Sequence, residues 1–71
     1  MNRNDFSSKF IVGDRVNISA TYKRYTQGKI VAINNDGIEI LNYFGYHVYW
    51  CYDEILNIEL VSPNLDKYRS T

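Results

Sequence analysis

The chain has 71 residues and a mass of 8.4 kDa, and its eight Lys and Arg balance eight Asp and Glu, so its formal net charge is zero. This length allows one hydrophobic core, and 45% apolar with 23% charged residues excludes a disordered polyelectrolyte. No apolar run approaches the roughly 20 residues of a membrane-spanning helix, and no signal-peptide segment follows Met1. The single cysteine, Cys51, excludes an internal disulfide, and we expect a cytoplasmic protein.

The first predicted elements are an arm and two strands separated by a loop. Residues 1–9 are polar apart from one Phe and predict a loose N-terminal arm. Residues 15–19 alternate apolar and polar side chains, which predicts a half-buried strand. Residues 20–27 mix aromatic with basic side chains without a period and are expected to form a long loop. Residues 28–33 are rich in β-branched side chains and predict the second strand.

The middle of the chain predicts a hairpin, a turn and a fourth strand. Residues 34–37 read Asn-Asn-Asp-Gly, a strong hairpin signal, because Asp and Gly accept the φ > 0 conformations of tight turns. Residues 38–42 form the return strand. Residues 43–46 place three aromatic side chains around a glycine and predict a second turn, and residues 47–51 alternate as a fourth strand.

The last part of the chain predicts one helical turn, a fifth strand and a tail. The helical turn covers residues 53–56, the strand covers residues 57–61, and Pro63 ends the pairing. Residues 62–71 form a polar C-terminal tail. The inward-facing residues are expected to be Val16, Ile18, Ile38, Ile40, Val48, Trp50, Ile58 and Leu60.

These five short strands, the long first loop and the late helical turn resemble the SH3-like small β-barrel, the superfold that includes the KOW, Tudor and Sm-like domains. The resemblance covers residues 10–61. It is carried by strand order and loop lengths, with residues 12–16 (Val-Gly-Asp-Arg-Val) and 28–31 (Gly-Lys-Ile-Val) similar to a KOW-type opening. The Asp and Asn of the first Sm motif have no match here. The resemblance implies an all-β, five-stranded antiparallel SH3-like barrel with one short helical turn before the last strand.

The residues needed for catalysis or metal binding are scarce. His47 and Cys51 lie four apart on one strand, which separates them by about 13 Å and is too far for one metal ion. No Gly-x-Ser-x-Gly elbow and no glycine-rich phosphate loop occurs. Asp53 and Glu54 are adjacent, and neighbours on a helical turn do not face each other. We therefore expect no enzyme activity, no cofactor and no metal.

The first candidate binding element is the loop after the first strand, which in SH3-like barrels usually carries ligand contacts. It holds Tyr22, Lys23, Arg24 and Tyr25, two cations between two aromatic rings. One interpretation is that the cations contact phosphates while the aromatic rings stack on nucleic-acid bases. Another is that the same four residues bind an acidic protein surface. The competing interpretation is a solvated loop whose tyrosines rest on the barrel.

The second candidate is an aromatic cluster around the turn at residues 43–46. Its members are Tyr43, Phe44, Tyr46, Tyr49 and Tyr52. We expect Trp50 and one turn aromatic to be buried and the others to form an exposed patch of the kind that marks an interface. The alternative is that Phe44 and one or two tyrosines close the end of the barrel. A cage for a methylated amine, as in Tudor-like barrels, is a minor hypothesis.

Two functions follow from these candidates. The first is a protein-binding module, an adaptor or inhibitor, or a self-associating domain. It would use Tyr22, Lys23, Arg24, Tyr25, Tyr43, Tyr46 and Tyr49. The second is a nucleic-acid-binding barrel that uses Arg15, Tyr22, Lys23, Arg24, Tyr25 and Lys29.

The distribution of charge bears on the choice between them. Residues 1–29 hold six basic and two acidic residues, and residues 30–71 hold the reverse. A basic face free of Glu39 and Glu59 would favour nucleic acid, whereas a continuous aromatic patch would favour a protein partner. Asn, Ile, Lys and Tyr, with AT-rich codons, supply more than a third of the chain, so we expect a gene from an AT-rich bacterium or its phage.

Overall fold

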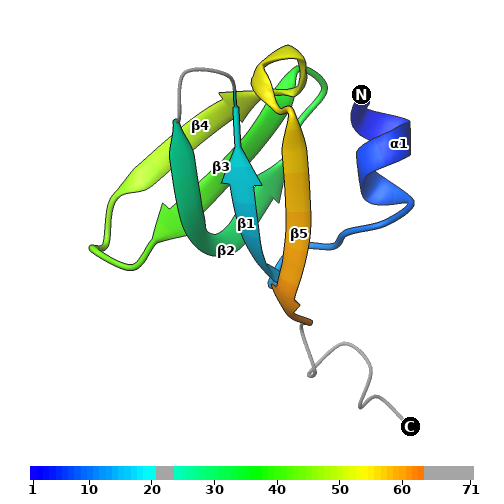
Figure 1. Ribbon diagram of the computed structural model, residues 1–71. Helices are drawn as coiled ribbons and strands as arrows, with labels where there is room; N and C mark the ends of the chain where they lie inside the picture. The colour runs from blue at the N-terminus through cyan, green and yellow to red at the C-terminus, as the bar shows by residue number, and fades with distance from the viewer. Residues whose placement is uncertain (21–23, 64–71) are drawn as a thin grey trace, which may run out of the picture.

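The computed structural model describes residues 1–20 and 24–63, and its five strands form one antiparallel sheet in the order β4-β3-β2-β1-β5 (Figure 1). The predicted all-β class, the five antiparallel strands and the helical turn before the last strand are confirmed. The elements are α1 (Arg3–Ser7), β1 (Arg15–Ser19), β2 (Tyr25–Ile33), β3 (Gly37–Asn42), β4 (His47–Cys51), the 3₁₀ turn η2 (Tyr52–Glu54) and β5 (Asn57–Ser62).

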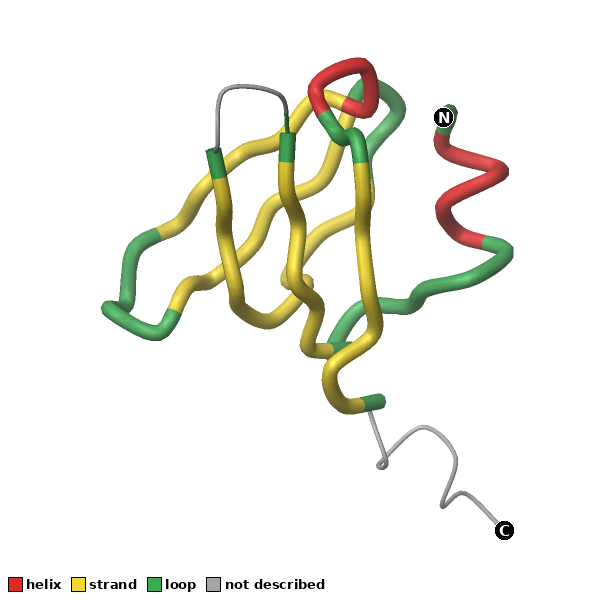
Figure 2. The backbone as a smooth tube through the Cα atoms, in the orientation of Figure 1, coloured by secondary structure: helices red, strands yellow, loops and turns green. Residues whose placement is uncertain are grey.

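The sheet is open, which corrects the prediction of a closed barrel. β4 pairs with β3 alone and β5 pairs with β1 alone, so these two strands are the edges of the sheet. Figure 2 shows the strands curving around a common interior while α1 lies to one side, next to β5. The rings of Phe6 and Phe10, from the N-terminal segment, complete the core beside the sheet.

β2 is the longest strand and belongs to both halves of the sheet. Its first part pairs with β1 from Tyr25↔Ser19 to Lys29↔Arg15, and its second part pairs with β3 from Gly28 to Ile33. A bulge near Val31 shifts the register with β3 and bends the strand. A side chain at Gly28 would collide with the backbone of β3, so glycine allows the two strands to meet there.

The core lies on one face of the sheet, as the alternation of side chains predicts. The fully buried residues include Val16, Ile18, Ile30, Ile38, Ile40 and Trp50. Val48 and Ile58 are half-buried and pack against this cluster. The prediction for Leu60 is wrong, because its side chain is 49% exposed. Leu60 belongs to β5, an edge strand that pairs with β1.

A helix lies within residues 1–9, where the sequence predicts a loose arm. The side chain of Asn2 accepts a hydrogen bond from the N–H of Asp5 (2.9 Å) and caps α1. Phe6 is fully buried, with its ring centre 5.0 Å from that of Phe10 and 5.8 Å from that of Tyr52. The N-terminal segment therefore contributes to the core. The predicted C-terminal tail lies outside the described residues from position 64 onward.

Candidate functional site

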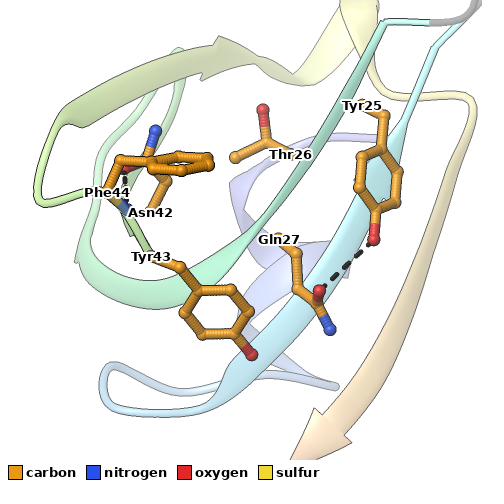
Figure 3. A pocket seen from close by; sticks show the side chains of 6 residues that line it. All are labelled: Tyr25, Thr26, Gln27, Asn42, Tyr43 and Phe44. Carbon is orange, nitrogen blue, oxygen red and sulfur yellow. Dashed lines mark hydrogen bonds between the residues drawn. The ribbon is translucent and has the colours of Figure 1, made fainter.

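A hollow opens where the first residues of β2 face the turn between β3 and β4. Its cavity volume is about 210 Å³. It is lined by Tyr25, Thr26, Gln27, Asn42, Tyr43 and Phe44 (Figure 3). Three of these side chains are large, aromatic and exposed: 59% for Tyr25, 57% for Tyr43 and 86% for Phe44. Two segments far apart in the sequence thus bring aromatic rings to one place.

Asn42 shapes the turn that presents the two rings from the hairpin. Its side-chain oxygen accepts hydrogen bonds from the N–H groups of Phe44 and Tyr46, each at 3.0 Å. Gly45 has a φ of +88°, a conformation that side chains disfavour. Its N–H donates to the carbonyl of Asn42 (3.1 Å). These bonds satisfy the backbone of the turn, and the aromatic side chains are left to project into solvent.

The opposite wall is held by two polar contacts of β2. The hydroxyl of Tyr25 donates a hydrogen bond that the side-chain oxygens of Asn17 (3.2 Å) and Gln27 (3.4 Å) are both placed to accept. Thr26 is buried, and its hydroxyl accepts a hydrogen bond from the indole N–H of Trp50 (3.0 Å). This wall of the hollow is therefore held by hydrogen bonds on both faces of the sheet, from Tyr25 on the outer face and to Thr26 on the core side.

Arg24 lies just before this wall and has several partners within the fold. Its guanidinium forms an ion pair with Glu54 (2.7 Å) and lies 4.1 Å from the ring centre of Trp50. It also donates to the carbonyl of Tyr49 (3.4 Å). A hydrogen bond from the N–H of Cys51 (2.9 Å) and the nearby guanidinium hold the pKa of Glu54 below its usual value. Arg24 thus links β2 to the turn after β4.

Two other cations lie side by side on the outer face of the sheet, the face opposite the core. Arg15 and Lys29 are cross-strand partners in the β1–β2 ladder. The guanidinium of Arg15 lies 5.8 Å from the ring centre of Tyr43. Glu39 and Glu59 occupy the same face, because they alternate with the inward residues of β3 and β5. The basic pair is therefore not on a face free of acidic residues.

The structure brings together only some of the residues that the sequence singles out. Tyr25 and Tyr43 meet at the hollow. Tyr46 and Tyr49 are exposed but do not line it. Tyr25 belongs to β2 and not to the predicted loop. Tyr22 and Lys23 lie outside the described residues.

The burial of the aromatic residues differs from the prediction. Trp50 is buried as expected, but no aromatic residue of the 43–46 turn enters the core. The interior is filled instead by Phe6, Phe10 and Tyr52.

Four residues that line the hollow are absent from the residues selected for partner binding: Thr26, Gln27, Asn42 and Phe44, of which Phe44 was named only as a member of the aromatic cluster. The Asn-Tyr-Phe-Gly sequence of the turn was the signal available for two of them, because an Asn before such a turn can bond to its amides. Thr26 and Gln27 lie on the wall because β2 begins earlier than its β-branched stretch indicates.

The described part of the chain holds no group of three or more His, Cys, Asp or Glu side chains placed to bind a metal ion. His47 and Glu39 form an exposed pair on the outer face. Partial desolvation and the Glu54 carboxylate raise the pKa of the Cys51 thiol, which disfavours a reactive thiolate. Within residues 1–20 and 24–63, no helix is both long and apolar enough to traverse a bilayer.

Comparison with protein families, with curated proteins and with solved structures found no match for this chain.

Proposed function

We propose that this chain is a non-enzymatic binding module that docks a protein partner through the hollow between β2 and the β3–β4 turn. The observation that carries the proposal is the convergence of Tyr25, Tyr43 and Phe44 on one cavity while each ring stays largely exposed. Large exposed apolar side chains that gather at one place favour an interface. Tyrosine is also enriched among the residues that dominate binding energy.

The size of the hollow favours a peptide side chain over a free small molecule. Pockets for small-molecule ligands usually enclose about 300–1,000 Å³. The cavity volume here is about 210 Å³, and the hollow is open to solvent. One or two side chains of a protein partner would fill this space.

Nucleic acid is the second candidate ligand. The guanidinium of Arg15 lies 5.8 Å from the ring centre of Tyr43, and Lys29 is the cross-strand partner of Arg15; such a set is able to contact phosphate and stack on a base. Glu39 and Glu59 on the same face, and the ion pair of Arg24 with Glu54, weigh against this function. A protein partner is therefore the function we favour.

The relationship to SH3-like domains is also a proposal. It is supported by the five antiparallel strands and by the short turn before β5. A cytoplasmic location and an origin in an AT-rich bacterium or its phage belong to the same proposal and rest on composition alone.

The test compares two Tyr→Ala variants of the same turn. Random short peptides displayed on phage are selected on the immobilised wild-type chain, and the best is synthesised with a fluorescent label. We expect Tyr43→Ala to weaken its binding about tenfold or more, because Tyr43 lines the hollow. Tyr46→Ala is the control, since Tyr46 is equally part of the turn but does not line the cavity.

Equal binding by both variants, or no selected peptide, would overturn the proposal. Labelled single-stranded DNA and RNA are titrated in parallel at low and moderate salt. Binding that weakens with salt and is lost in Arg15→Ala with Lys29→Ala would establish the nucleic-acid function instead.

A further inference from the structure

We propose that the partner is an extended acidic segment that pairs with the open edge of β2 at Tyr25–Gln27 as an added strand. The inference rests on the proposed function, and it specifies how the hollow is used. In strand addition, main-chain hydrogen bonds supply affinity and alternate side chains supply specificity. Three features of the structure point to this mode.

The first feature is the direction of the backbone groups of β2. The N–H of Ala20 donates to the carbonyl of Arg24, and the N–H of Ile30 donates to the carbonyl of Asp14, both at 2.9 Å. Hydrogen-bonded pairs alternate with non-hydrogen-bonded pairs in an antiparallel ladder. The even-numbered residues of this stretch therefore bond to β1. The N–H groups of the odd-numbered residues, such as Gln27, point away from β1.

The second feature is that β3 does not extend along this part of β2. Their register ends at Gly28↔Asn42, and the chain then turns at residues 43–46. The N–H groups of Tyr25 and Gln27 have no hydrogen-bond partner within residues 1–20 and 24–63. Unpaired groups at a strand edge are a template for another strand.

The third feature is the position of the hollow on the edge of the strand. Side chains alternate between the two faces of a sheet, so a cavity on one face is lined by every second residue. Here three successive residues, Tyr25, Thr26 and Gln27, line the cavity. A segment that pairs with this edge would pass through the hollow and present side chains to both faces.

Charge specifies the occupant. Arg15, whose guanidinium lies near the ring of Tyr43, and its cross-strand partner Lys29 are on the outer face, and neither forms an ion pair with another described residue. On the inner face, the exposed ring of Phe44 borders the cavity. The complementary strand carries acidic residues toward Arg15 and Lys29, and it alternates them with apolar residues that cover Phe44.

The experiment removes one backbone N–H and retains the rest of the site. Gln27→Pro deletes the N–H that points to the open edge and leaves the bonds from β2 to β1, which use the neighbouring residues. Gln27→Ala removes the same side chain and keeps the N–H. We expect the peptide selected on the wild-type chain to bind Gln27→Pro about tenfold more weakly than Gln27→Ala.

A second measurement needs no variant of the protein. The same peptide is synthesised with single N-methyl groups on successive amides. Because alternate amides of an added strand face β2, we expect methylation to weaken binding at every second position. This periodicity keeps the test decisive if the proline variant does not fold.

Each outcome separates strand addition from the proposed function. Equal affinities of Gln27→Pro and Gln27→Ala, with binding still lost in Tyr43→Ala, would overturn strand addition and leave the docking hollow intact. Selected peptides that are basic would overturn the assignment of an acidic occupant. Self-association of the chain in sedimentation that is abolished by Gln27→Pro would make a second copy the occupant and overturn a separate partner.

Discussion

Phe6→Ala tests whether the N-terminal helix is an integral part of the folded domain. The side chain of Phe6 is fully buried and contacts the rings of Phe10 and Tyr52. Truncation of a buried Phe to Ala costs about 3–5 kcal/mol through lost burial and the cavity that remains. The better helix propensity of Ala returns no more than about 0.5 kcal/mol. A chain of 71 residues has a total stability of only about 4–11 kcal/mol. We therefore expect Phe6→Ala to remove about a quarter or more of the free energy of unfolding.

The assay is urea unfolding followed by far-ultraviolet circular dichroism. With a slope of about 1–3 kcal/mol per molar urea, the midpoint of Phe6→Ala falls by at least about 1 M. Phe44→Ala is the matched control, because it makes the same chemical change at a side chain that is 86% exposed. Its free energy of unfolding stays within about 0.5 kcal/mol of that of the wild type. Equal midpoints for the two variants would refute the reasoning that α1 belongs to the core.

Three further predictions concern Thr26 and Gln27, which line the hollow, and Glu54, the ion-pair partner of Arg24. Thr26→Val leaves the buried indole N–H of Trp50 without its acceptor and is expected to cost about 1–3 kcal/mol in urea unfolding, whereas Thr26→Ser retains the hydroxyl and most of the stability. The hydrogen bond from the N–H of Cys51 lowers the pKa of Glu54, so its contribution to stability is present above the unfolded pKa of about 4.3 and is lost as the pH falls through the folded value. Glu54→Gln should therefore lower the melting temperature at neutral pH and match wild type in acid; a deficit that persists in acid would contradict this. In hydrogen exchange followed by NMR, the amide of Gln27 should exchange faster than the amide of Thr26, and equal protection would show that the edge of β2 is covered.

Much of the sheet could be predicted because, along most strands, the alternation of apolar and polar residues in the sequence agrees with which side chains are buried in the structure. β4 begins and ends at the predicted residues, since its alternation of apolar and polar side chains matches two faces of different polarity. The start of β2 was missed because Tyr25, Thr26 and Gln27 carry no apolar period, and their strand conformation depends on pairing with β1. The helix α1 was missed because five residues with one apolar side chain give no helical period.

The candidate site was harder to predict from the sequence, because it depends on where β2 begins. The sequence predicts Tyr25 as a binding residue because it lies in a stretch that mixes basic with aromatic residues, and Tyr43 because it flanks a turn; both side chains are exposed. The end of β3 at Asn42 agrees with the predicted strand, but the extension of β2 back to Tyr25 does not, and that extension brings Tyr25 beside the turn that carries Tyr43. The ion pair of Arg24 with Glu54 joins residues 30 positions apart and has no local signature.

The contacts of Trp50 give the protein an optical reporter of its own. Its indole bonds to Thr26, which lines the hollow, and lies beneath the guanidinium of Arg24. It is the single tryptophan of the chain, so the emission arises from one known position. A ligand that moves either neighbour changes the surroundings of this fluorophore. Unlabelled protein can therefore be titrated with unlabelled ligands, and large compound or peptide collections can be screened without attaching a dye to either component.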